Sequence, residues 1–226
     1  MGYYPVFLEL KDRPCIVVGG GAVAERKVEG LLAAGARVTV VSPELTPSLA
    51  ALKEEGRLQH VARPYREGDL EGYEVAVVAT DDGSVNAGVA REGRERRVWV
   101  NAVDDPPNCD FILPSVIRRG ELVIAVSTGG ASPALARRLR EELEAFLEED
   151  NAPLAELLQD VRQELRARGI VVDTETWQRS ISGRLRALLA QGRAGEARAY
   201  LLTSLGLEAP ACRTGRSAIA ATDSEK

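Results

Sequence analysis

A run of three consecutive glycines, Gly19 to Gly21, is the feature that most constrains how this chain can fold. The apolar segment Ile16-Val17-Val18 precedes the glycines, and an Ala- and Leu-rich segment with helical spacing follows them as far as Ala34. This pattern is typical of a buried parallel strand that turns sharply into a helix. A second β-branched run, Arg37 to Val41, completes a strand-helix-strand unit. The spacing therefore predicts a dinucleotide-binding turn of the Rossmann type.

The positions of this turn have separate expected roles. Gly19 permits the tight turn, Gly21 lets the backbone approach a pyrophosphate, and Ala24 is the small position where helix and strand pack closely. The backbone N–H groups of Ala22 and Val23, at the positive end of the helix, are expected to face the phosphates. The same pattern alone also occurs as a packing turn in α/β proteins, so its strand and helix context carries the prediction.

The end of the second strand lacks the acidic residue that commonly holds the ribose hydroxyls of NAD. Ser42 and Pro43 stand there, and Glu44 follows. Either Glu44 or backbone groups near Pro43 take that role, or the adenosine end is held loosely. No arginine lies in this stretch to meet a 2′-phosphate, which favours NAD over NADP.

Strands and helices alternate through the first half of the chain, which predicts a parallel, doubly wound sheet. We expect strands at Tyr3–Leu10, Ile16–Val18, Arg37–Val41, Leu58–Ala62, Val75–Ala79 and Val98–Val100, and helices at Ala22–Ala34, Pro47–Glu55 and Ser84–Arg94. Ligands in such sheets bind beyond the carboxyl ends of the strands. The converging loops are Gly19–Val23, Ser42–Glu44, Thr80–Asp82 and Asn101–Asp105, with Thr80 and Asn101 as further cofactor contacts.

The pattern changes after Asp110. Two β-runs, Phe111–Val116 and Glu121–Ser127, predict an antiparallel hairpin whose edges a second subunit could cover, so we expect a homodimer. A long helix follows, with Ser132 as its N-cap and Pro133 at its first position. Its apolar face is marked by Leu135, Leu139, Leu143 and Phe146. The glycine-rich start of this helix is either a flexible turn or a second ligand contact.

The remainder of the chain predicts three helices and a tail. The helices are expected at Pro153–Arg168, Thr174–Gln191 and Gly195–Leu205. The last residues are rich in small and polar types and are expected to be disordered. The sequence thus divides into a Rossmann domain at 1–112, a dimerisation region at 113–150, a helical cap at 151–208 and a tail at 209–226.

Composition narrows the class of protein. The net charge of −5 gives no basic field for nucleic acid, and no run approaches the ~20 apolar residues of a membrane span. The cysteines, Cys15, Cys109 and Cys212, fit neither a disulfide framework nor zinc-site spacing. His60 is the only histidine, on a strand expected to lie away from the converging loops, so no permanent metal site is predicted. We expect a cytoplasmic protein.

Several motifs, in register over about residues 3 to 150, together resemble precorrin-2 dehydrogenase, the dehydrogenase/ferrochelatase module of siroheme synthase. The motifs are Tyr4–Leu8, Val18–Lys27, Ala79–Asp82, Val100–Pro106, Cys109–Pro114 and Ser127–Ala136. The resemblance implies oxidation of the tetrapyrrole precorrin-2 to sirohydrochlorin with NAD as hydride acceptor. In some members of the family a metal ion, Fe²⁺ or Co²⁺, is then inserted. The methyltransferase domain of fused relatives is not expected, because the sequence stops after the helices.

The resemblance also implies site residues. Asp104 occupies the position of the family's functional aspartate, and its carboxylate would take a proton as hydride leaves or accept pyrrole protons as metal enters. Asp105 is the competing candidate. Thr128 stands where a close relative has a serine that lines the tetrapyrrole pocket. Precorrin-2 carries eight carboxylates and needs cationic partners, for which Arg118 and Arg137 are candidates beside Arg119, Arg138 and Arg140.

Two other functions fit part of the sequence. One is a Rossmann oxidoreductase that acts on another small acid. The other is a regulatory module that senses NAD(H) without tetrapyrrole turnover, which would leave the Asn101–Asp105 and Ser127–Ala136 segments without a role.

Overall fold

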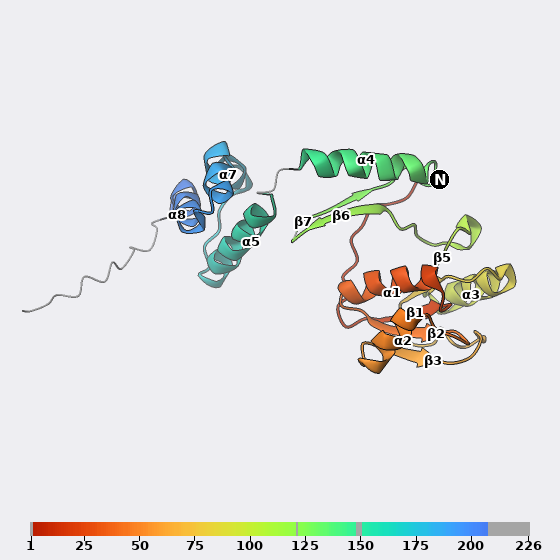
Figure 1. Cartoon of the computed structure of the whole chain (residues 1–226). Coiled ribbons are helices and arrows are strands. Elements are labelled where there is room, and N and C mark those ends of the chain that lie inside the picture. The colour runs from red at the N-terminus through yellow and green to blue at the C-terminus, as the bar shows by residue number, and fades with distance from the viewer. Residues whose placement is uncertain (1, 121, 148–150, 208–226) are drawn as a thin grey trace, which may run out of the picture. The chain divides into compact units, whose positions relative to one another are not determined.

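The computed structural model describes residues 2–120, 122–147 and 151–207, which form two compact units. The first unit contains residues up to Leu113 together with 129–131, and the second contains 114–128 and the described residues from 132 onward (Figure 1). The finer division into domains stays a prediction. No helix in these described ranges is long and apolar enough to cross a membrane.

The first unit is built on a five-stranded parallel sheet in the order β3-β2-β1-β4-β5. Its strands are β1 (Pro14–Val18), β2 (Arg37–Val41), β3 (Leu58–Val61), β4 (Val75–Val78) and β5 (Trp99–Ala102). Its helices are α1 (Ala22–Ala33), α2 (Pro47–Glu54), α3 (Gly83–Arg96) and the short 3₁₀ helix η1 (Pro106–Asn108). The predicted Rossmann-type α/β fold is confirmed.

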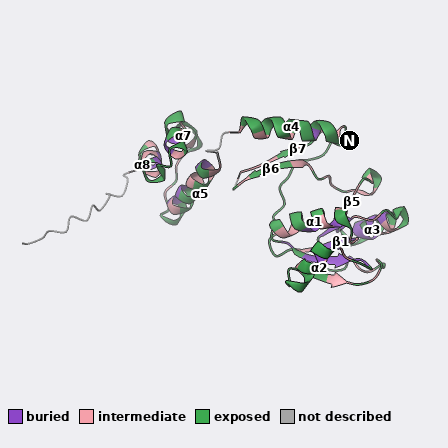
Figure 2. Ribbon diagram, in the orientation of Figure 1, coloured by how far each residue is buried: buried purple, intermediate pink, exposed green. Residues whose placement is uncertain are grey.

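Both faces of this sheet are packed. One apolar cluster joins β1 and β2 to Ala24 and Val28 of α1, and the other joins β1 and β4 to Val89 of α3. Figure 2 shows the buried residues concentrated in the central strands and on the inward sides of these helices. Burial on both faces explains why the strands are continuous β-branched runs rather than alternating ones.

The predicted lead strand at Tyr3–Leu10 is wrong. Residues 2–10, all of them described, form neither strand nor helix, and Tyr4 and Phe7 are 87% and 71% exposed. An alternating apolar pattern needs a neighbouring strand to bond to, and only Leu10 packs against the core of this unit.

The second unit begins with the antiparallel hairpin of β6 (Ser115–Arg119) and β7 (Leu122–Val126), against which α4 (Pro133–Phe146) packs. The first strand of the hairpin, β6, starts later than predicted, because residues 110 and 111 are instead hydrogen-bonded to β5 of the first unit. Asp110 N–H donates to Val100 O (2.8 Å), and the Asn101 side-chain amide donates to Phe111 O (2.8 Å).

Four further helices, α5 (Asn151–Ala167), α6 (Thr174–Ser180), α7 (Gly183–Ala190) and α8 (Ala194–Ser204), surround a separate apolar core. The single helix predicted over 174–191 is two helices. Ser182 separates them, since its hydroxyl caps α7 by accepting from Leu185 N–H (3.3 Å). The predicted tail at 209–226, including Cys212, lies outside the described residues.

Candidate functional site at the carboxyl edge of the sheet

Parallel register brings the four predicted segments to one edge of the sheet in the first unit. Val18 pairs with Val41 on one side and with Val78 on the other, and Val78 pairs with Ala102. The loops after β1, β2, β4 and β5 therefore start level with one another, as expected for a ligand site in a doubly wound sheet.

Gly19 makes the turn out of β1. Its φ of +117° lies in the region that only glycine adopts readily, and a Cβ on it would lie 2.3 Å from Ala79 O. Its N–H donates to Val41 O (2.9 Å). The turn thus needs glycine at this position both for its backbone angle and for the close approach of the loop after β4.

Gly20 is a position of the site whose need for glycine sequence reasoning missed. A Cβ there would lie 2.0 Å from Glu44 O and 2.6 Å from Ser42 Oγ. The Gly20 carbonyl accepts from Thr46 N–H (3.0 Å), so the loop after β2 lies directly on the glycine turn. The only signal in the sequence was that the run has three glycines, where the dinucleotide-binding pattern needs only Gly19 and Gly21.

Gly21 differs from both, because a Cβ on it would meet no atom within 4 Å. It is the N-cap of α1 and brings no side-chain cap, whereas Asp82 caps α3 by accepting from Ser84 N–H (2.8 Å). The first N–H groups of α1, those of Ala22 and Val23, therefore have no acceptor within their helix. An open backbone approach and uncapped N–H groups fit the pyrophosphate of a dinucleotide.

The loop after β2 is held by its own side chains. Ser42 is buried and its hydroxyl donates to Glu44 O (2.6 Å), while Thr46 donates to Glu25 (2.6 Å). His60 Nε2 lies 2.8 Å from Ser42 O, so the expectation that His60 is remote from the loops is wrong. Pro43 and Glu44 are left exposed on a fixed backbone.

Asn86 of α3 links the loops after β4 and β5. This side chain is only 6% exposed; its Oδ1 accepts from Thr80 Oγ1 (3.3 Å) and its Nδ2 donates to Asp105 Oδ2 (3.3 Å). The same Asp105 oxygen accepts from Asn108 Nδ2 (2.9 Å). Sequence reasoning missed Asn86, since nothing in a helix pattern marks one asparagine as buried.

Asn101 is buried near the end of β5, and its side-chain amide bonds to the segment that follows this strand at the carboxyl edge of the sheet. Its Nδ2 donates to Phe111 O and lies 3.7 Å from Cys109 Sγ, which in turn donates to Ala102 O (3.0 Å). Burial is the main cause that raises the pKa of the Cys109 thiol. This group of contacts fixes the chain that leaves β5.

Asp104 and Asp105 are in different environments. Asp105 is engaged by two amides, whereas Asp104 is exposed and adopts a φ of +59°, a left-handed conformation unusual for a residue other than glycine. Lys27 of α1 is within electrostatic range of Asp104. Burial and then Arg26 lower the pKa of Lys27, while the Asp104 carboxylate acts in the opposite direction.

The remaining predicted residues lie in the second unit. Thr128 Oγ1 donates to Ser132 O and accepts from Ser132 N–H, both at 3.0 Å, so its hydroxyl organises the start of α4. Arg119 donates to Glu144 O in the last turn of α4 and to the O of Leu147, the residue that follows the helix. Arg138 and Arg140 pair with glutamates one turn along the same helix. Arg118 and Arg137 are exposed.

Comparison with known proteins agrees with this geometry. Residues 6–115 match a family described as "Putative NAD(P)-binding", and residues 119–145 match one described as "Sirohaem biosynthesis protein central". The first unit is thus an NAD(P)-binding domain of the Rossmann class.

Siroheme synthase of Thioalkalivibrio sulfidiphilus (strain HL-EbGR7) is 44% identical over 91% of this chain and 42% of the relative. Siroheme synthase 1 of Serratia proteamaculans (strain 568) is 41% identical over 89% of this chain and 43% of the relative. The chain spans less than half the length of these relatives. The solved structure of SirC, precorrin-2 dehydrogenase, matches with a TM-score of 0.74 and 30% identity over 89% of this chain and 98% of SirC. The chain belongs to the precorrin-2 dehydrogenase family.

Proposed function

We propose that this protein oxidises precorrin-2 to sirohydrochlorin with NAD as the acceptor. The match to SirC, which extends over nearly all of that chain, is the observation that carries the proposal. The reaction removes two hydrogens from the tetrapyrrole: NAD takes one as hydride, and the other leaves as a proton. The protein must therefore hold the dinucleotide, orient the tetrapyrrole and accept a proton.

The glycine turn would hold the dinucleotide. The uncapped N–H groups of Ala22 and Val23, beside the open backbone of Gly21, support a pyrophosphate contact. Pro43 and Glu44, exposed on the rigid loop after β2, would meet the adenosine ribose. Further cofactor contacts are assigned to Gly19, Thr80 and Asn101, at the ends of β1, β4 and β5.

Asp104 would be the catalytic base. A carboxylate that is exposed at the carboxyl edge of the sheet is available to take the proton as hydride departs. Asp105 is less suited to this role, because the amides of Asn86 and Asn108 occupy its carboxylate. The left-handed backbone at Asp104 also concentrates strain where a functional residue is expected.

The carboxylates of precorrin-2 need cationic partners. Arg118 and Arg137 are exposed guanidiniums and are assigned to the tetrapyrrole carboxylates, with Thr128 as a further substrate contact. Sirohydrochlorin could then accept Fe²⁺ or Co²⁺ as a second substrate, with Asp104 taking the pyrrole protons. In that step the metal is cargo, and the nitrogens of the macrocycle are its ligands.

We place the protein in the cytoplasm and propose that it forms a homodimer. The apolar stripe of α4 supports the homodimer, since Leu135, Leu139 and Phe146 are 49%, 37% and 83% exposed in the single chain. A contiguous exposed stripe of this kind marks an interaction surface.

The test is anaerobic incubation of the purified protein with precorrin-2 and NAD, with the absorbance of NADH and of sirohydrochlorin followed together. Both signals should rise in proportion and should be absent without protein. A later addition of Fe²⁺ or Co²⁺ should change the spectrum faster than in a protein-free control if the chain is also a chelatase. Tight NADH binding with no tetrapyrrole turnover would contradict the proposal and favour a sensor of NAD(H).

A further inference from the structure

The loop between β3 and β4 brings an arginine to the adenosine side of the sheet edge. Val41 of β2 pairs with Val61 of β3, so the loops after these two neighbouring strands leave the sheet at the same edge, and Arg63 is the second residue past Val61. Ser42 N–H donates to Val61 O (3.2 Å), and Arg63 N–H donates to the same oxygen (2.9 Å), so the chain turns directly after β3 and keeps Arg63 close to the end of that strand. In a Rossmann domain the end of β2 is where the 2′-hydroxyl of NAD, or the 2′-phosphate of NADP, is met.

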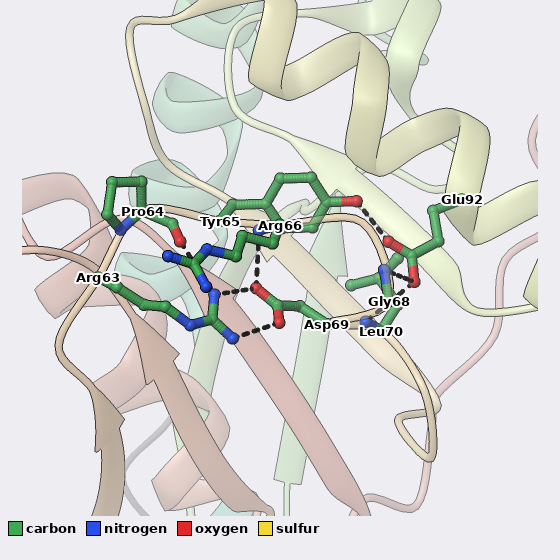
Figure 3. A network of polar contacts seen from close by, with 8 residues as sticks. All are labelled: Arg63, Pro64, Tyr65, Arg66, Gly68, Asp69, Leu70 and Glu92. Atoms are coloured by element: carbon green, nitrogen blue, oxygen red, sulfur yellow. Dashed lines mark hydrogen bonds and ion pairs between the residues drawn. The ribbon is translucent and has the colours of Figure 1, made fainter.

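Both terminal nitrogens of the Arg63 guanidinium donate to Asp69. One terminal nitrogen donates to Asp69 Oδ2 at 2.7 Å and the other to Oδ1 at 2.6 Å, a bidentate pair drawn in Figure 3. The first nitrogen also donates to Pro64 O (2.9 Å). The Asp69 side chain is 12% exposed, and its hydrogen bonds from Arg63 are the main cause that lowers its pKa.

The loop does not depend on this ion pair for its position. Glu92 of α3, 2% exposed, accepts from Gly68 N–H (3.0 Å), from Leu70 N–H (3.2 Å) and from the Tyr65 hydroxyl. These contacts bracket Asp69 on both sides, as Figure 3 shows. The fully buried Leu70 adds an apolar anchor. Removal of the Asp69 charge should therefore free Arg63 without unfolding the loop.

We propose that Asp69 determines the preference for NAD over NADP by occupying Arg63, the arginine placed to meet a 2′-phosphate. The exposed Glu44 adds a negative charge at the same edge, which repels a phosphate and can accept from a ribose hydroxyl. Arg66 also faces the pair, and its backbone N–H donates to Asp69 Oδ2 (2.9 Å). This inference rests on the proposed function, since it requires a dinucleotide at the glycine turn.

The test measures the dissociation constants of NADH and NADPH by fluorescence titration, without tetrapyrrole. The wild type should bind NADH at least tenfold more tightly. In Asp69→Asn the NADPH affinity should rise about five- to tenfold with NADH affinity within twofold, and the double variant Asp69→Asn/Arg63→Met should lose the gain. Glu71→Gln is the matched control, since it removes one negative charge from the same loop while its partner Arg96 remains paired with Glu92.

Two outcomes overturn the inference while leaving the proposed function intact. One is a folded Asp69→Asn variant whose NADH to NADPH ratio equals that of the wild type. The other uses Arg63→Met alone, which should leave both affinities within twofold; a large selective loss of NADPH binding would show that Arg63 already meets the phosphate. A wild type that binds neither dinucleotide would overturn both proposals.

Discussion

The sheet of the first unit and the hairpin with α4 in the second differ in how completely they bury their apolar residues. The sheet is packed on both faces, with β1 and β4 almost entirely buried. In the described part of 114–147, only Ile117 and Ala136 are buried, and Figure 2 shows α4 as mostly exposed. A complete core lets the sheet hold its loops rigidly, whereas the hairpin and α4 leave apolar side chains exposed.

The two units also use charge differently. In the first unit a buried carboxylate, Glu92, organises a loop through backbone N–H groups. In the second, exposed ion pairs such as Arg138–Glu142 run along single helices. Buried pairs cost much when broken and exposed ones little, so substitutions should affect the two units unequally.

The largest effect is expected from Glu92→Ala, which leaves the Tyr65 hydroxyl and two backbone N–H groups without their acceptor and removes the nearer carboxylate from Arg96. We expect a loss of about 3–5 kcal/mol in the free energy of unfolding of the first unit. The control Glu164→Ala, in the second unit, breaks only partly exposed pairs and should cost about 1 kcal/mol or less.

The two tryptophans allow this measurement in each unit separately, since Trp99 is in the first and Trp177 in the second. Urea titration of Trp177→Phe reports the first unit through Trp99, and Trp99→Phe reports the second. If Glu92→Ala shifted both transitions equally, the two units would not be independent.

Leu139→Asp tests whether the α4 stripe binds a second copy. A buried leucine contributes about 1.5–3 kcal/mol, and a two-fold interface would lose it twice, so the dimer should weaken at least about a hundredfold. Sedimentation at several concentrations measures this. Ala134→Asp adds the same charge to an exposed position in the first turn of α4 and should leave the dimer intact. A wild-type protein that is monomeric at all concentrations would contradict the proposed homodimer.

Gly20→Ala and Gly21→Ala should separate stability from binding within one turn. The first places a Cβ against Glu44 O and should cost about 2–3 kcal/mol, whereas the second meets no protein atom and should change stability by less than about 0.5 kcal/mol. Gly21→Ala should instead weaken NADH about tenfold, as measured by titration. If Gly21→Ala lowered stability and left NADH affinity unchanged, the pyrophosphate would not lie against Gly21.

Asn86→Ala should have a smaller effect than the substitutions of Glu92, Leu139 and Gly20. Loss of its bonds to Thr80 and Asp105 should cost about 1–2 kcal/mol and lower kcat about fivefold, because the loop that bears Asp104 loses a support. Asn108→Ala removes only the second amide on Asp105 and should lower kcat less. Equal effects of the two variants on kcat would show that the link from α3 is not what positions the loop.

Local sequence patterns predicted the sheet and the helices because each β-branched run and each cap acts within a few residues. The roles of Gly20 and Glu92 depend on contacts with Glu44 and with residues 65–70, which a local pattern does not contain. Glu92 in particular lies among charged residues of α3 and would be read as exposed. The start of β6 was predicted too early for the same reason, since Asp110 and Phe111 are held by bonds to β5, which are not local.

The matched pair Asp104→Asn and Asp105→Asn tests most directly whether Asp104 takes the proton at the edge of a dinucleotide-binding sheet. Initial rates of NADH formation from precorrin-2 would be measured with NADH affinity and thermal stability. Asp104→Asn should lose at least about a hundredfold in rate with unchanged stability and NADH affinity, while Asp105→Asn should lose stability and no more than about fivefold in rate. A wild-type rate in Asp104→Asn, or a greater loss in Asp105→Asn, would contradict the account.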